Sequence, residues 1–334
     1  MKAFQYVSAR STQEAVTLLG DDYAKTKILA GGLDLLGEMK LHLLEPETVV
    51  SIQGLDELRL LQNTGGTLKI GALVTLAEIA ADATIRAKYT ALADAAEVVG
   101  SPQIRNVGTL GGNLCQRPRC WYYRDEAYRC FKKGGTMCYS IVGKNRYHAI
   151  LGGGPCFMVH PSDCAPALAA LGATVQLLGP DGSRVVPIED FFISPSQSLV
   201  RENVVKPKEM LVAVEIPERN RQSAYIKFRE KEGFDWALSA VALALEFDGL
   251  KCAKANLVLG GVAPIPWRVK KAETLLVGNP ITEEIAKAVG EAAVESAMAL
   301  SENSGKIPLT KALVKEAILK LTPTSTAVHD SRLY

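Results

Sequence analysis

The residues best suited to chemistry are cysteines that crowd one basic, aromatic stretch of the chain. Of the seven cysteines, six fall between Cys115 and Cys164, so they are not spread as disulfide staples usually are. Clustered thiols are typical of metal centres. The stretch has no C-x2-C pair, which argues against structural zinc and against plant-type 2Fe-2S spacing. The five that compete as ligands are Cys115, Cys120, Cys130, Cys138 and Cys156.

Two glycine pairs, Gly31-Gly32 and Gly111-Gly112, each follow a short apolar segment. Without a Cβ, such a loop lets backbone N–H groups approach a phosphate. A plain turn or a helix C-cap is the alternative interpretation of either pair alone. Neither pair fits G-x-G-x-x-G or the P-loop pattern, so a Rossmann dinucleotide site and an NTPase are not supported.

The elements that position these residues alternate between strands and helices. An apolar strand at 26–30 leads into the first glycine pair, and a helix follows at 35–40. The periodicity of 83–99 predicts one longer helix that ends before Gly100. Three strands are predicted near the C-terminal end, at 224–229, 238–247 and 253–262, followed by helices at 283–300 and 309–321.

Composition limits the classes of protein. The chain has 334 residues, 48% of them hydrophobic, and a net charge of +2, which gives no field for nucleic acid or anionic lipid. No run reaches the roughly 18 apolar residues of a membrane span, and the start lacks the apolar core of a secretory signal. We therefore expect a cytoplasmic protein, although co-export to the periplasm with a partner would leave the same sequence.

Several spaced motifs resemble one family along nearly the whole chain. They are Ala30-Gly-Gly-Leu-Asp34, Thr109-Leu-Gly-Gly-Asn113, His160-Pro-Ser-Asp163, Lys227-Phe-Arg229 and Phe234-Asp-Trp-Ala237. In this order they resemble the FAD-binding subunit of the molybdenum hydroxylases, the group of xanthine dehydrogenase, carbon monoxide dehydrogenase and aldehyde oxidoreductases.

The resemblance implies an α+β fold with a two-lobed FAD-binding domain of the vanillyl-alcohol-oxidase type, followed by a C-terminal antiparallel sheet with helices, as in CO dehydrogenase flavoproteins. The implied parts are a small lobe at 1–55, a larger lobe at 56–220 and a C-terminal domain at 221–334. No catalytic residue is implied. The residues implied to hold FAD are Leu29, Ala30, Gly31, Gly32, Leu33, Asp34, Leu35, Thr109, Gly111, Gly112, Asn113, Asp163, Leu211 and Lys227.

Residues 115–158 form an insertion where most family members have a short connection. The insertion is similar to that of the flavin subunits of 4-hydroxybenzoyl-CoA reductase and of three-subunit periplasmic aldehyde oxidoreductases, which carry an additional 4Fe-4S cluster. The implied ligands are Cys120, Cys130, Cys138 and Cys156. A set with Cys115 in place of Cys156 remains the alternative.

The resemblance also implies the function, that of an electron-transfer subunit. Electrons from a molybdenum cofactor on a large partner would pass through 2Fe-2S clusters of a small partner to FAD and on to an external acceptor. A reductase-like or xanthine dehydrogenase-like subunit, a stand-alone flavin oxidoreductase and a non-enzymatic assembly protein are the alternatives. The basic residues of the insertion favour either docking of an acidic carrier or a plain solvated face.

Overall fold

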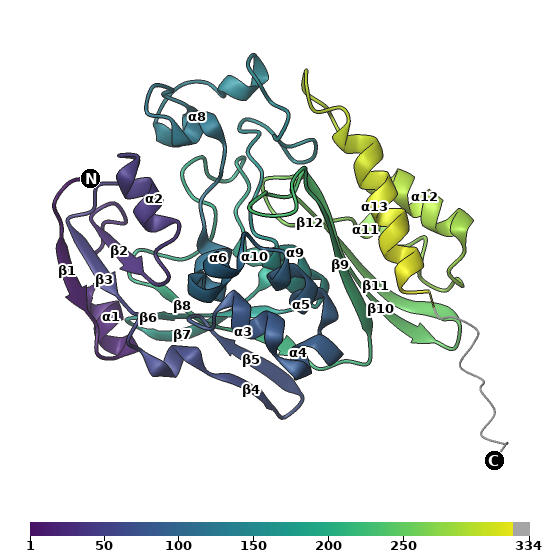
Figure 1. Ribbon diagram of the computed structural model, residues 1–334, viewed down its shortest axis with the longest axis horizontal. Helices are drawn as coiled ribbons and strands as arrows, with labels where there is room; N and C mark the ends of the chain where they lie inside the picture. The colour runs from purple at the N-terminus through teal and green to yellow at the C-terminus, as the bar shows by residue number, and fades with distance from the viewer. Residues whose placement is uncertain (323–334) are drawn as a thin grey trace.

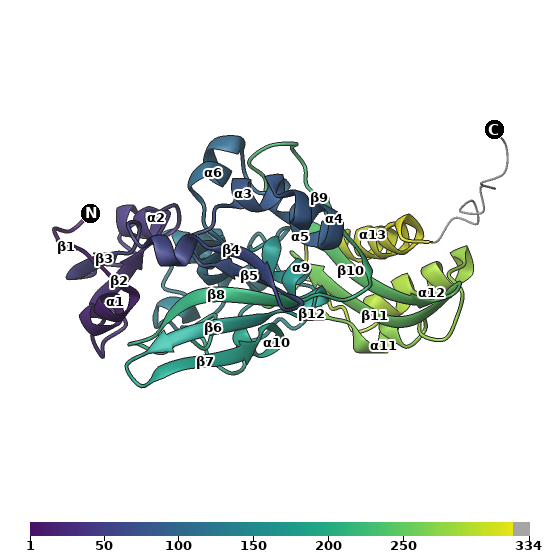
Figure 2. The ribbon, with the colours of Figure 1, turned by 90° about the horizontal axis from the view of Figure 1, so that it is seen from below.

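The computed structural model describes residues 1–322, in which three sheets follow one another along the long axis (Figure 2). The first sheet is small and parallel, in the order β1 (Gln5–Ser8), β3 (Thr48–Ser51), β2 (Thr26–Leu29). Helices α1 (Thr12–Leu18) and α2 (Leu35–Lys40) connect its strands. Because β2 runs directly into the first glycine pair, this sheet fixes the position of that loop.

The middle sheet has five strands and is antiparallel. Its order is β4 (Leu61–Thr64), β5 (Thr67–Gly71), β8 (Met210–Pro217), β6 (Thr174–Gly179), β7 (Gly182–Pro187). The largest apolar core lies between this sheet and its helices. These are α3 (Leu76–Ala81), α4 (Ala83–Lys88), α5 (Thr90–Glu97), α7 (Leu110–Cys115), α9 (Cys164–Ala170) and α10 (Ile188–Phe191), whereas α6 (Pro102–Val107) has no buried residue.

The single helix predicted at 83–99 is wrong, because the chain forms α4 and α5 with a break at Tyr89. Tyr89 leaves the helical region with φ of −130° and buries its ring in the core, where it is 1% exposed. Asp82 caps α4 by accepting a hydrogen bond from the Ile85 amide. Burial of one large side chain therefore overrides the apolar periodicity of the segment.

The third sheet is antiparallel, in the order β12 (Trp267–Arg268), β11 (Lys251–Gly260), β10 (Ser239–Asp248), β9 (Gln222–Phe228). Helices α5 and α9 of the middle part pack on this sheet, as do α11 (Lys270–Glu273), α12 (Glu283–Ala293) and α13 (Lys306–Lys320). No helix within residues 1–322 is long and apolar enough to cross a membrane.

These sheets confirm the predicted α+β class with an antiparallel sheet and helices at the C-terminal end. The boundaries at 55 and 220 stay predictions. The last residues of the predicted C-terminal domain, 323–334, lie outside the described part of the chain.

The insertion between α7 and α9 contains no strand in the structure. Its regular parts are single helical turns, α8 (Trp121–Arg124), η2 (Phe131–Lys133) and η3 (Tyr139–Ile141). It lies between α2 on one side and α13 on the other (Figure 1). Ion pairs reach α2, and the Lys306 ammonium at the start of α13 donates to the carbonyl of His148. Side-chain contacts therefore position a segment that has little secondary structure of its own.

Candidate functional site

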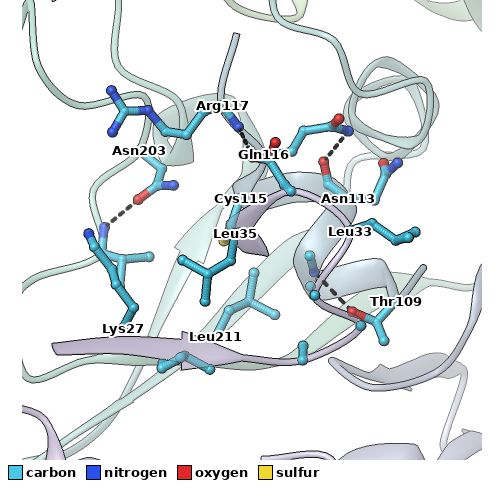
Figure 3. A pocket seen from close by; sticks show the side chains of 18 of the residues that line it. Lys27, Leu33, Leu35, Thr109, Asn113, Cys115, Gln116, Arg117, Asn203 and Leu211 are labelled. Atoms are coloured by element: carbon cyan, nitrogen blue, oxygen red, sulfur yellow. Dashed lines mark hydrogen bonds between the residues drawn. The ribbon is translucent and has the colours of Figure 1, made fainter. Parts of the chain in front are cut away.

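A cavity of about 450 Å³ opens between the first sheet, the Thr109 turn and the 199–211 segment. This volume is within the range of cofactor and ligand pockets. Figure 3 shows side chains from these segments, among them Leu33, Thr109, Arg117 and Leu211, around a common space. We call this space the glycine-loop cavity, because both glycine pairs line it.

The two glycines of the first pair serve different purposes. A Cβ on Gly31 would lie 2.2 Å from the Val107 carbonyl oxygen, so Gly31 allows the two loops to approach each other. Gly32 has φ of +76°, which favours glycine. In residues 1–322, the amides of Gly31, Gly32 and Leu33 donate no hydrogen bond. Free amides facing a cavity suit the phosphates of a dinucleotide.

The second glycine loop is held by a helix cap. The Thr109 hydroxyl accepts a hydrogen bond from the Gly112 amide at 3.2 Å and so begins α7. Ser162 donates to the side-chain oxygen of Asn113 at 2.5 Å, which ties this loop to the chain just before α9. The loop is therefore fixed from both ends.

The structure brings most of the predicted FAD residues to this cavity. Leu29 lies instead in a small apolar core, and Asp163 and Lys227 are buried elsewhere. The predicted residues that line the cavity are Ala30, Gly31, Gly32, Leu33, Asp34, Leu35, Thr109, Gly111, Gly112, Asn113 and Leu211.

Asp163 and Lys227 pair with each other. Lys227 Nζ lies 2.7 Å from Asp163 Oδ2, and the Tyr225 hydroxyl donates to Asp163 Oδ1 at 2.6 Å. Both side chains of the ion pair are about 3% exposed or less. The Asp163 carboxylate makes no capping bond to α9, a role that Ser162 takes by accepting from the Ala165 amide. The assignment of this pair to FAD stays a prediction.

One end of the glycine-loop cavity carries cations that the motifs did not indicate. Lys27 lies 4.2 Å over the ring of Tyr23, and the Arg201 guanidinium lies 5.8 Å from the same ring. Burial lowers the pKa of Lys27 to about 8. In a strand at Thr26–Leu29, alternation places Lys27 and Leu29 on the same face. That pattern does not show whether the Lys27 ammonium is buried or in solvent, so the sequence could not identify Lys27 as a cavity residue.

A second cavity, of only about 10 Å³, lies inside the insertion. Its walls are aromatic and apolar, apart from the cysteines and one lysine, Lys132. We call it the thiol cavity. The cysteines that line it are Cys120, Cys130, Cys138 and Cys156. Cys115 lines the glycine-loop cavity instead.

The thiols of the second cavity differ in their hydrogen bonds. The neighbouring Cys156 thiol and the Ser140 hydroxyl, which lies 3.0 Å from Cys138 Sγ, lower the pKa of Cys138. Burial raises the pKa of Cys120 to about 11. His148 Nε2 lies 3.2 Å from Cys120 Sγ, and burial lowers the pKa of His148 to about 4. The four thiols of this cavity therefore have different surroundings.

The thiols are not arranged for a single ion. In the described residues, no three His, Cys, Asp or Glu side chains are close enough together to hold one metal ion. Tetrahedral zinc with Zn–S bonds of about 2.3 Å would need sulfurs about 3.8 Å apart. All seven cysteines lie in the described part of the chain and none forms a disulfide, while Cys164 and Cys252 are buried core residues.

A thin wall of ionic side chains separates the two cavities. Glu202 lines the glycine-loop cavity, and its carboxylate lies 2.5 Å from Lys132 Nζ in the thiol cavity. Arg117 pairs with the other oxygen of Glu202 at 2.6 Å. Beside them, the Tyr123 hydroxyl donates to Glu38 at 2.5 Å, and burial raises the pKa of Glu38. Glu38 and Glu202 lie outside every motif and were missed by the sequence analysis.

Asp34 joins the first glycine loop to the insertion. Its carboxylate accepts the Arg117 amide at 2.6 Å and lies 2.6 Å from the Arg119 guanidinium and 2.7 Å from that of Arg124. The predicted docking patch or solvated face is therefore wrong for these arginines and for Lys132, which point inward. They neutralise acidic groups at the cavity wall.

Family models and known proteins match this chain along its length. Residues 2–219 match the FAD binding domain in molybdopterin dehydrogenase, and residues 223–322 match the CO dehydrogenase flavoprotein C-terminal domain. The chain is 34% identical to the aldehyde oxidoreductase FAD-binding subunit PaoB of Escherichia coli K12, over 93% of this chain and 96% of that protein. It is 30% identical to the carbon monoxide dehydrogenase medium chain of Hydrogenophaga pseudoflava, over 87% and 86%.

Solved structures agree with these matches. A chain of quinoline 2-oxidoreductase from Pseudomonas putida 86 superposes with a TM-score of 0.76 at 27% identity, covering 96% of this chain and 98% of that one. Carbon monoxide dehydrogenase from Hydrogenophaga pseudoflava gives 0.76 at 27%, over 96% and 97%. With two glycine loops around one cavity and a family match over most of its length, the chain belongs to the FAD-binding subunits of the molybdenum-containing dehydrogenases.

Proposed function

We propose that this chain is the electron-transfer flavoprotein subunit of an aldehyde-oxidising molybdenum hydroxylase and carries a 4Fe-4S cluster besides FAD. FAD would be held by the amides of the two glycine loops, and Cys120, Cys130, Cys138 and Cys156 would hold the cluster. A flavin exchanges electrons both in pairs and singly, which suits a position between clusters and an external acceptor. The likeness to PaoB supports aldehydes as the substrate class.

The meeting of four cysteines in one apolar cavity carries the cluster proposal. A cubane spreads its thiolate ligands more widely than a single ion does, in line with thiols that line one space without forming a mononuclear site. Lys132 supplies a buried positive charge beside them, and such charge offsets that of a cluster with thiolate ligands. The placement of Cys115 in the other cavity supports Cys156 as the fourth ligand.

The proposal includes two partner subunits, a large one with the molybdenum cofactor and a small one with 2Fe-2S clusters. Its support is the family, whose members above are named as FAD-binding subunits or medium chains. The substrate would react on the large partner, since no acid–base group of this chain is assigned a catalytic role. The external acceptor would receive electrons from the flavin.

Metal analysis of the anaerobically purified complex tests this function. We expect about four irons and four labile sulfides per chain in addition to those of the small partner, with one FAD. Cys130→Ser should remove these irons, and Cys115→Ser should keep them. Cys252→Ser, in the core of the third sheet, is the matched control. Zinc, or no metal beyond that of the partner, would refute the cluster, and the reverse result for the two variants would overturn the ligand set.

A further inference from the structure

The wall between the two cavities contains one carboxylate that pairs with a cation from each of them. Glu202 is 4% exposed at its side chain, and it pairs with Lys132 at 2.5 Å and with Arg117 at 2.6 Å. The two cations approach different oxygens, Oε1 for Lys132 and Oε2 for Arg117. Glu202 and Arg117 line the glycine-loop cavity, whereas Lys132 lines the thiol cavity. One anion therefore holds a cation at each site.

Three charged groups make the direct contacts at this wall. Lys132 and Arg117 contribute two positive charges and Glu202 contributes one negative charge, with the Glu38 carboxyl group close to Arg117. Lys132 Nζ also donates to the Leu199 carbonyl at 3.1 Å, so the lysine is fixed from two directions and is 1% exposed. Because Lys132 and Glu202 are shielded from water, their charges act strongly on a neighbouring centre, and Arg117 is 20% exposed. Removal of any one of the three would change the field in a direction known in advance.

We propose that Glu202 is a positioning residue that sets the reduction potentials of both centres together, by holding Arg117 at the flavin and Lys132 at the cluster. This inference rests on the proposed function. Net charge and hydrogen bonds around a cluster tune its potential, and a negative charge near either centre disfavours the gain of an electron. A change in the charge of this carboxylate would thus shift both potentials in the same direction.

The sign of the shift tests the inference. Glu202→Gln removes a negative charge that lies in the glycine-loop cavity and 2.5 Å from the lysine of the thiol cavity, so both potentials should rise. Lys132→Gln removes a positive charge from the thiol cavity, so the cluster potential should fall more than the flavin potential. Arg117→Gln should lower the flavin potential more. A purely structural role would not give opposite signs for neighbouring residues. Glu273→Gln is the control, since Glu273 is also buried but pairs with Arg268 in the third sheet, away from both cavities.

The measurement is a redox titration of the purified complex, with the flavin followed by absorbance and the cluster by low-temperature EPR, after iron and FAD contents are determined. If Glu202→Gln keeps its iron and FAD and neither the flavin nor the cluster potential changes, this inference is overturned and the proposed function stands. A shift at one centre only would also overturn it. A wild-type complex without the extra iron would overturn both together. If Glu202→Gln loses a cofactor, Lys132→Gln and Arg117→Gln decide instead. The cluster potential should fall more in the first and the flavin potential more in the second, and equal falls at the two centres in both variants would refute the link.

Discussion

The glycine-loop cavity and the thiol cavity are built in different ways. The first lies at the ends of strands and helix caps, where backbone bonds and glycine contacts fix the loops. The second lies in a segment without strands, held by ion pairs to Asp34 and Glu202 and by the ammonium of Lys306. Backbone geometry therefore shapes the glycine-loop cavity before a cofactor binds. The shape of the thiol cavity depends instead on ion pairs between the insertion and other parts of the chain.

The largest effect should come from the buried ion pair between Asp163 and Lys227, which lines neither cavity. Lys227→Met leaves Asp163 buried with Tyr225 as its remaining partner in the described residues. Breaking a buried pair in this way typically costs about 3–5 kcal/mol. Chemical denaturation would measure the loss. The control is Lys69→Met, whose pair with Glu215 is partly exposed and should be worth about 0–1 kcal/mol. If both variants lose a similar free energy of unfolding, burial of the Asp163–Lys227 pair does not make it more important for stability than an exposed pair.

A methyl group at the first glycine loop should have the next largest effect. In Gly31→Ala, the new Cβ would lie 2.2 Å from the Val107 carbonyl oxygen, and a backbone atom cannot turn aside. We expect a loss near the upper end of the about 1–3 kcal/mol typical of overpacking, with weaker retention of FAD. Thermal unfolding and flavin absorbance would measure the two effects.

Gly54→Ala is the matched control for that change. A Cβ on Gly54 meets nothing within 4 Å, and its φ is not positive. The substitution should be neutral or stabilise by about 0.4–1 kcal/mol through the unfolded state. If both alanine variants bind FAD equally well, the close approach of the loops is not what shapes the cavity.

Loss of an ion pair that holds the insertion should destabilise the insertion without destabilising the rest of the protein. Asp34→Asn removes the ionic partner of Arg119 and Arg124, yet the amide can still accept the Arg117 N–H. Since the Asp34 side chain is 17% exposed, we expect about 1 kcal/mol, or a roughly fivefold rise in local opening. Hydrogen exchange of residues 116–148 would show it, with little change in the third sheet. A uniform rise across the protein would contradict a local role.

The same contrast explains what the sequence could predict. Strand-to-glycine transitions and clustered cysteines are local patterns, so they predicted both loops and a metal centre with five candidate ligands. The class of fold and the choice of four cysteines came from the resemblance to the family. Glu202 and Glu38 carry no pattern, because their role comes from partners far along the chain, such as Arg117 and Tyr123. The inward direction of the arginines was hidden for the same reason. Charge alone does not tell which face of a coil is buried.

The smallest effect concerns the joint between the insertion and α13, where Lys306 is buried without a carboxylate. Its ammonium donates to the carbonyls of Gly261 at 2.6 Å and His148 at 3.0 Å, and burial lowers the pKa of Lys306 to about 7 from 10.5. A lysine whose pKa falls on folding is penalised while charged. Between about pH 7 and 10 the unfolded chain binds more protons, so the free energy of unfolding should rise with pH, by at most about 1.4 kcal/mol per unit.

The carbonyl acceptors favour the charged form, so we expect a slope well below this limit. Lys306→Met should remove this dependence of the free energy of unfolding on pH. The difference in unfolding free energy between the natural protein and this variant, measured by denaturation from pH 7 to 9.5, should therefore shift toward the natural protein as the pH rises. Other titrating groups are common to both proteins and cancel in the difference. If the difference stays constant, Lys306 keeps its proton in the folded protein from pH 7 to 9.5. The contact between the insertion and α13 then includes a charged ammonium over that whole pH range.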